Sequence, residues 1–156
     1  MFVAPQITLR GAMPGDWNAI ASLLLAHRLP PDGAQAHLSD YIVACHCAEV
    51  VGVAGLEVYG DTALLRSFAV APAAQRQGLG RLLLEDLLTQ ARRRHITSLY
   101  LLTTTAEEYF ARWGFQPTAR GDAPHALHAS AEFQGACPAT AVLMSLALSP
   151  PAAHRP

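Results

Sequence analysis

An amphipathic helix between two apolar segments constrains the fold of this chain more than any other feature. Residues 79–94 place leucine and alanine side chains at helical spacing on one face. Residues 63–71 before them and residues 98–103 after them are rich in apolar side chains, as buried strands are. A strand, a helix and a second strand need a crossover connection. The two strands are therefore expected to be parallel neighbours, or near-neighbours, in one sheet.

The rest of the chain supplies more strands and some shorter helices. Five further segments have the pattern of strands: 7–10, 41–47, 50–59, 116–119 and 139–147. Helical signals begin at Asp16 as an N-cap, extend over residues 34–40, and follow a capping box made by Thr105 and Glu108. We predict an α/β (α+β) fold with a mixed central sheet and flanking helices. One domain is expected over residues 1–148, with a flexible tail at 149–156.

Composition excludes several classes of protein. The 156 residues are 51% hydrophobic and 15% charged, with a net charge of -1, which is typical of a globular protein. That charge favours neither a nucleic-acid partner nor an anionic membrane. No apolar run approaches the roughly 20 residues of a membrane span. Three cysteines do not make a disulfide framework. We therefore expect a cytoplasmic protein.

A loop with two glycines joins the first strand of the crossover to its helix, and its sequence is Gln75-Arg76-Gln77-Gly78-Leu79-Gly80-Arg81. Glycine lets the backbone turn tightly and a ligand approach closely. The first turn of a helix offers unpaired N–H groups and a positive dipole end, which suit a pyrophosphate. The third glycine of a dinucleotide fingerprint is missing, as is the lysine of a Walker loop. By spacing alone, a glycine used for helix–strand packing is the alternative.

In its context this loop resembles the acetyl-CoA signature of the GNAT superfamily of N-acetyltransferases, Gln/Arg-x-x-Gly-x-Gly/Ala. It follows a strand that ends in Phe68-Ala69-Val70-Ala71-Pro72. The likeness continues through residues 99–104 and 109–115, and it covers residues 5 to 148. The resemblance implies the GNAT fold, acetyl-CoA as co-substrate, no metal, and direct attack of an amine in a ternary complex.

The resemblance also implies roles for individual residues. The backbone of residues 75–81 would hold the pyrophosphate of CoA. Phe68, Ala69 and Val70 would lie along the pantetheine arm, with main-chain N–H groups near Phe68 polarising the thioester carbonyl. Thr104 and Phe110 are further expected contacts of the cofactor.

Two positions depart from the family pattern. Many members have a glutamate base four residues before the valine that aligns with Val70, and here that residue is Arg66, which cannot act as a base. Many also have a tyrosine acid four residues before the glycine of Gly114, and here that residue is Phe110. Strand alternation would place Arg66, Phe68 and Val70 on one face.

Two interpretations of Arg66 follow. It binds a carboxylate of the acceptor in bidentate fashion, with Ser67 beside it, or it pairs structurally with Glu57 or Asp61. Candidates for catalysis are Glu57, acting as a base through water, and Tyr109. A solvated strand residue is the alternative for Glu57.

Within the superfamily, residues 64–67 and 101–105 resemble two groups: the catalytic domain of bacterial N-acetylglutamate synthase, and short acetyltransferases associated with arsenic-resistance operons. The insert at 120–138 is most similar to the second group. Both imply a small amino-acid-like acceptor. A protein or peptide N-acetyltransferase and a non-catalytic acyl-CoA-binding module are the alternatives. Many relatives dimerise, which leaves a homodimer open.

The cysteines have a structural interpretation. If residues 45–47 form a strand, Cys45 and Cys47 share a face and His46 points away, which is poor geometry for a metal site. Cys137, in the insert, is expected to be a small buried cysteine.

Overall fold

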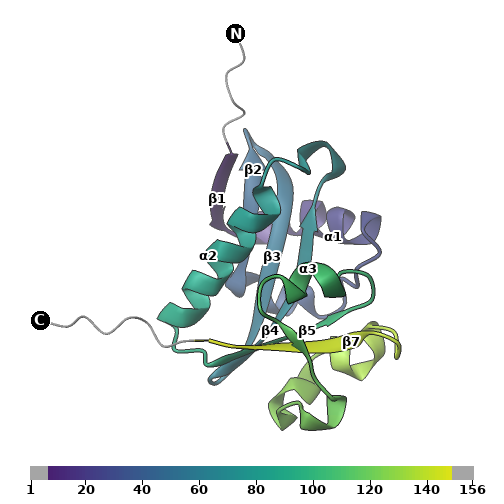
Figure 1. Ribbon diagram of the computed structural model, residues 1–156. Helices are drawn as coiled ribbons and strands as arrows, with labels where there is room; N and C mark the ends of the chain where they lie inside the picture. Colours follow the sequence, from purple (N-terminus) through teal and green to yellow (C-terminus); the bar gives the residue numbers. More distant parts are fainter. Residues whose placement is uncertain (1–6, 149–156) are drawn as a thin grey trace, which may run out of the picture. The chain divides into compact units, whose positions relative to one another are not determined.

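The computed structural model describes residues 7–148, so the predicted tail at 149–156 lies outside the described residues (Figure 1). Within them, seven strands are hydrogen-bonded in the order β1-β2-β3-β4-β5-β7-β6. The strands are β1 (Ile7–Gly11), β2 (Tyr41–His46), β3 (Glu49–Tyr59), β4 (Thr62–Val70), β5 (Ser98–Thr103), β6 (Gln116–Pro117) and β7 (Val142–Ala147). Strands β4 and β5 are parallel, whereas β1–β2, β2–β3, β5–β7 and β6–β7 are antiparallel. The predicted mixed sheet and its parallel crossover are confirmed.

In the described part of the chain, three α-helices and several short helical segments connect the strands. The α-helices are α1 (Trp17–Ala26), α2 (Leu79–Arg93) and α3 (Glu107–Ala111). The short segments are η1 (Pro14–Asp16), η2 (Ala34–Asp40), η3 (Pro72–Ala74), η4 (Arg120–Asp122), η5 (His125–Ala129) and η6 (Glu132–Ala136). None of the helices within residues 7–148 is long and apolar enough to span a bilayer.

The chain divides into two compact units. The first comprises the described residues up to Gly55 together with Ser67–Leu87. The second comprises Leu56–Arg66 together with the residues from Leu88 onward. The boundary therefore crosses β3, β4 and α2, and each unit is described separately below.

The first unit has an apolar core beneath α1. Ile20 and Leu24 of α1 are four residues apart and fully buried, as expected for one face of a helix. They pack in one cluster with Tyr41 and Val43 of β2, and Ala69 of β4 belongs to the same cluster.

The start of α1 differs in detail from the prediction. Asp16 does occupy the N-cap position of α1. Its carboxylate, however, accepts a hydrogen bond of 2.7 Å from the N–H of Met13 and pairs with Arg10, also at 2.7 Å. The side chain therefore closes the preceding turn η1 and ties it to β1.

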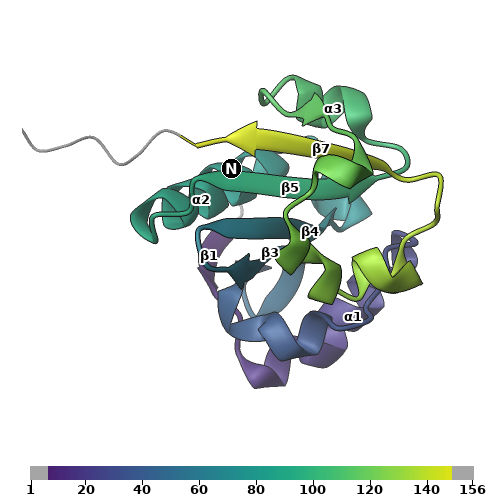
Figure 2. The same cartoon turned by 90° about the horizontal axis from the view of Figure 1, so that it is seen from below.

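The second unit is organised around β5. Thr62–Leu64 of β4 pair with Ser98–Tyr100, and all six residues of β5 pair with β7 on the other side (Figure 2). Burial alternates along β5, with Leu99 and Leu101 almost inaccessible. The N–H of Thr97 donates to the carbonyl of Asp61 at 2.7 Å, which joins the start of β5 to the turn before β4.

The helix after β5 begins differently from the prediction. Its N-cap is Ala106, whose N–H donates to the Thr103 hydroxyl at 3.0 Å, so the expected capping box of Thr105 and Glu108 is wrong. The helix ends at Ala111, before the predicted end at Gly114, and Gly114 closes the turn that follows with φ +98. A left-handed glycine after the last turn is a common helix terminator.

Candidate functional site

The end of β4, in the first unit, contains a left-handed residue. Ser67 adopts φ +61, a conformation that residues with a side chain rarely take. It interrupts the extended backbone between Arg66 and Phe68. Counting alternate residues therefore does not place Arg66, Phe68 and Val70 on one face, and that prediction is corrected. The Ser67 hydroxyl lies 2.7 Å from the Tyr41 hydroxyl, with both side chains buried.

Two side chains converge on the last carbonyl of β4. Nε2 of His27 lies 2.8 Å from the oxygen of Val70, and Nε2 of Gln75 donates to the same oxygen at 2.9 Å. A carbonyl oxygen has two lone pairs: Gln75 donates to this one, and the imidazole of His27, whose Nδ1 lies 2.9 Å from the Leu23 carbonyl oxygen, also faces it. The Gln75 side chain therefore fastens the loop to the strand, and the Val70 carbonyl is engaged within the protein.

The loop between β4 and α2 contains two left-handed residues just before the helix. Arg76 adopts φ +67 and Gly78 adopts φ +75, and α2 begins at the next residue, Leu79. A β-carbon added at Gly78 would meet nothing within 4 Å. Gly78 is thus required by its backbone angle and not by helix–strand packing. Turns of this kind before a helix orient successive N–H groups into an anion-binding concavity.

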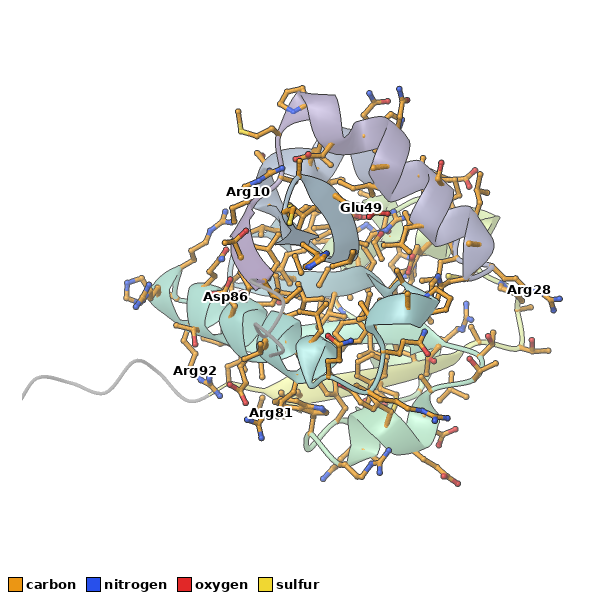
Figure 3. The ribbon with its side chains drawn as sticks, turned by 90° about the horizontal axis from the view of Figure 1, so that it is seen from above. Arg10, Arg28, Glu49, Arg81, Asp86 and Arg92 are labelled. Carbon is orange, nitrogen blue, oxygen red and sulfur yellow. The ribbon has the colours of Figure 1, made fainter. Side chains whose placement is uncertain are left out.

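The arginine on the first turn of α2 extends outward from the helix (Figure 3). The side chain of Arg81 is 71% exposed, and its Nε lies 3.2 Å from a carboxylate oxygen of Glu85, one helical turn further on. An exposed pair of this kind contributes little to stability. The charge of Arg81 therefore stays accessible to an anion in solvent.

A cluster of ionisable groups is buried in the second unit. Nη1 of Arg66 lies 2.8 Å from a carboxylate oxygen of Glu57, and its Nε lies 3.3 Å from a carboxylate oxygen of Glu132. The three side chains are 0%, 1% and 5% exposed respectively. Tyr59 donates its hydroxyl hydrogen bond to Glu57. Arg66 thus joins β3, β4 and the η6 segment within the protein interior.

The carboxyl group of Glu132 has an unusual environment. Its burial raises its pKa from 4.5 to about 7, although the charge of Arg66 and a hydrogen bond from Cys137 act in the opposite direction. The charge of Glu57, which also pairs with Arg66, raises the pKa of Glu132 further. Burial likewise raises the pKa of the Cys137 thiol to about 12 and that of the Tyr59 hydroxyl well above its usual range.

These contacts test the structural roles predicted for the charged residues. The structural pairing of Arg66 with Glu57 is confirmed, whereas the suggested partner Asp61 lies in the turn, where its carbonyl accepts from Thr97. Glu57 is 1% exposed, so the prediction of a solvated strand residue is wrong. Glu132 was missed because nothing in its sequence neighbourhood distinguishes it from a surface residue. Every buried side-chain nitrogen or oxygen within residues 7–148 has a hydrogen-bond partner.

The remaining predicted residues lie on or near α3, in the second unit. Phe110 is buried, and its ring packs edge-on to Phe115 with centroids 5.7 Å apart. Tyr109 is half-buried, and the guanidinium of Arg112 lies 5.9 Å from the centre of its ring. Thr104 is exposed just after β5. Cofactor contacts of Thr104 and Phe110, and a catalytic role of Tyr109, stay predictions.

No group of three or more histidine, cysteine, aspartate or glutamate residues in the part of the chain that the structure describes is placed to hold a metal ion. Cys45 is buried at the end of β2. Cys47 lies beyond the strand, in a turn where it adopts φ +55. The assumption that both cysteines lie on one strand is therefore wrong.

Comparison with known proteins gives the family. A family model described as an acetyltransferase (GNAT) domain matches residues 37–117, just over half of the chain. An amino-acid acetyltransferase of Neisseria meningitidis is 30% identical over 128 residues. The match covers 76% of this chain and 29% of that relative, so the chain spans less than a third of the relative's length.

Solved structures similar to this chain support the same family. N-acetylglutamate synthase of Neisseria gonorrhoeae, in complex with coenzyme A and N-acetyl-glutamate, superposes with a TM-score of 0.78 at 25% identity. That match covers 92% of this chain and 35% of the synthase. A Mycobacterium tuberculosis protein in complex with CoA has a TM-score of 0.75 at 23% identity, over 91% of this chain and 99% of its own. By its sequence match and its fold, the chain belongs to the GNAT family of acetyltransferases.

Proposed function

We propose that this protein transfers the acetyl group of acetyl-CoA to the amino group of a small amino-acid-like acceptor, by direct attack in a ternary complex. The observation that carries the proposal is the left-handed loop between β4 and α2, in a chain of the GNAT family. The relative named as an amino-acid acetyltransferase and the synthase structure with N-acetyl-glutamate support the choice of acceptor.

The loop accounts for binding of the co-substrate. Main-chain N–H groups of residues 75–81 would hold the pyrophosphate, because this loop turns at Arg76 and Gly78 and opens directly into α2. Arg76 and Arg81 would add mobile positive charge, and Arg81 is largely exposed. The pantetheine arm would then follow the end of β4, with its thioester carbonyl at the N–H groups near Phe68.

The reaction itself makes simple chemical demands. The neutral amine of the acceptor attacks the thioester carbon, a C–N bond forms, and the carbonyl oxygen takes up negative charge. The C–S bond then breaks, the CoA thiolate leaves, and the amine loses a proton to water. Donors aimed at the developing oxyanion and correct positioning of the amine supply much of the rate in reactions of this type.

The carboxylate of an amino-acid acceptor has a candidate partner in Arg66, with Ser67 beside it. Arg66 is buried against Glu57 and Glu132, so such binding requires one carboxylate to leave. Glu132 is the more easily displaced, because its contact is longer, 3.3 Å against 2.8 Å. Burial also raises the pKa of Glu132 to about 7. Breaking its ion pair with Arg66 therefore costs less free energy near neutral pH, where part of Glu132 is protonated.

Turnover of acetyl-CoA should be followed by mass spectrometry with amino acids, aminophosphinates, arsenical amino acids, polyamines and a peptide as acceptors. We expect acetylation of a carboxylate-bearing acceptor. In Arg66→Lys the KM for that acceptor should rise about tenfold or more, because lysine keeps the positive charge but cannot bind a carboxylate in bidentate fashion. Arg93→Lys, on the exposed side of α2, is the matched control.

Three outcomes would overturn parts of the proposal. An unchanged KM in Arg66→Lys would remove Arg66 from acceptor binding. Acetylation of the peptide alone would indicate a protein-modifying enzyme. Tight binding of acetyl-CoA without turnover of any acceptor in the panel would indicate a non-catalytic acyl-CoA-binding module.

A further inference from the structure

A strained residue lies next to the main chain that would meet the thioester. Ser67 is left-handed at φ +61 within β4, and Phe68 follows it directly. A residue with a β-carbon is less stable in this conformation than in the extended one, so the surrounding structure must hold it there. Strained backbone of this kind is concentrated at functional sites.

The side chain of Ser67 contacts a tyrosine from another strand. The hydroxyl oxygens of Tyr41 and Ser67 are 2.7 Å apart, and the two residues are 1% and 5% exposed. In a dry environment such a hydrogen bond is stronger than it is in water. The bond reaches from the first residue of β2 to the left-handed position in β4.

A glycine in the intervening strand makes this reach feasible. Gly55 of β3 is the register partner of Tyr41. A β-carbon added at Gly55 would lie 2.1 Å from the ring of Tyr41, far inside van der Waals contact. The ring of Tyr41 therefore occupies the space that any side chain at position 55 would need. Tyr41 therefore contacts both residues: its ring lies over Gly55, and its hydroxyl is hydrogen-bonded to Ser67.

We propose that Tyr41 is a positioning residue, which holds Ser67 in its left-handed conformation and thereby aims the main-chain N–H of Phe68 at the thioester carbonyl of acetyl-CoA. In this role Tyr41 acts through its contact with Ser67, and not by touching a substrate. The part of this proposal that directs the Phe68 N–H at the thioester rests on the proposed function. The part in which Tyr41 holds the conformation of Ser67 does not.

The test compares Tyr41→Phe with the double variant Tyr41→Phe/Ser67→Gly. The single change removes the hydroxyl and leaves the ring over Gly55. Serine should then relax toward an extended backbone, whereas glycine adopts a positive φ without steric cost. Tyr100→Phe, a tyrosine on β5, is the matched control, and thermal melting establishes that each variant is folded.

Two readouts separate the two halves of the proposal. Carbon-13 chemical shifts of Ser67 report its backbone conformation, and the amide shift of Phe68 on addition of acetyl-CoA reports its approach to the co-substrate. Once an acceptor has been identified, kcat should fall about tenfold in Tyr41→Phe, because the N–H of Phe68 no longer points at the oxyanion. The KM for acetyl-CoA should change much less, and the double variant should recover most of kcat.

The outcomes decide each half. Wild-type shifts at Ser67 in Tyr41→Phe would overturn the control of Ser67 by Tyr41. A changed Ser67 with unaltered kcat, or a double variant no faster than the single one, would overturn the link to Phe68. If the wild type acetylates nothing in the panel, the proposed function fails. The amide shift of Phe68 with acetyl-CoA, and its loss in Tyr41→Phe, then decides the positioning role.

Discussion

The buried carboxyl group of Glu132 should make stability depend on pH in a direction opposite to that of most paired carboxylates. A carboxylate stabilised by an arginine has a lowered pKa, and the protein loses stability as pH falls. For Glu132, burial outweighs the attraction of Arg66 and raises the pKa to about 7. The folded state therefore favours the protonated form, and its advantage is lost as pH rises.

The magnitude follows from the two pKa values. The unfolded chain titrates Glu132 near 4.5, and the folded chain titrates it near 7. Each pH unit between them corresponds to about 1.36 kcal/mol, so about 3 kcal/mol of stability is present below pH 4.5 and lost by the time the pH has risen through 7. Because a small protein is stable by only about 5–15 kcal/mol in total, the loss is readily measured.

The assay is urea denaturation of the wild type and of Glu132→Gln at pH values from 4.5 to 8. Glutamine resembles the protonated carboxyl group and does not titrate, so the difference between the two proteins isolates Glu132 from every other group. We expect the free energy of unfolding of the wild type to fall relative to the variant by about 3 kcal/mol over this range. Glu49→Gln, at the exposed start of β3, is the control for the substitution itself.

The reasoning would be refuted by a difference that stays flat with pH, since Glu132 would then have the same pKa folded and unfolded. A difference that grows in favour of the wild type at high pH would refute it more strongly. In that case the attraction of Arg66 would exceed the cost of burial, and Glu132 would be an ordinary ion-pair partner.

Three further changes have expected outcomes. Gly55→Ala should lower the free energy of unfolding, measured in urea, by about 2 kcal/mol or more, because the added β-carbon would meet the ring of Tyr41. Gly11→Ala is the control and should be nearly neutral, because a β-carbon at Gly11 would meet no atom within 4 Å. Gly78→Ala meets no neighbour but forces φ +75 on a residue with a side chain, so it should cost about 1 kcal/mol and weaken acetyl-CoA binding in calorimetry. Arg81→Ala should leave the melting temperature nearly unchanged, and its loss of acetyl-CoA affinity should shrink as salt is added.

Features that depend on local pattern were accessible from the sequence. The helix predicted at 79–94 is α2 at Leu79–Arg93, and the strand predicted at 98–103 is β5 with the same bounds. Their periods of 3.6 and 2 are properties of single segments, so no knowledge of tertiary contacts is needed. The crossover rule then gave the parallel pairing of β4 with β5.

Features that depend on tertiary partners were not accessible. The strand predicted at 139–147 begins only at Val142, because the N–H of Ala141 closes a turn on Pro138. The left-handed Ser67 has no signature in the sequence, since serine is common in ordinary strands and turns. Its conformation depends on Tyr41, which is 26 residues earlier in the chain.

Arg66 shows most clearly where sequence reasoning ends. The residue type alone indicated that the family's glutamate base is absent, and that an arginine at this position needs an anionic partner. It did not indicate two partners, because Glu132 lies in the insert, 66 positions away from Arg66. With both carboxylates ionised, the trio of Glu57, Arg66 and Glu132 carries one negative charge, as a single glutamate would. With Glu132 protonated the trio is neutral. Since burial raises the pKa of Glu132 to about 7, the charge of this cluster changes near neutral pH. Arg66 replaces the negative charge of the family's glutamate, and the carboxylate of Glu132, from the insert, brings the net charge of the cluster back to that of a glutamate only when the pH is high enough to ionise it.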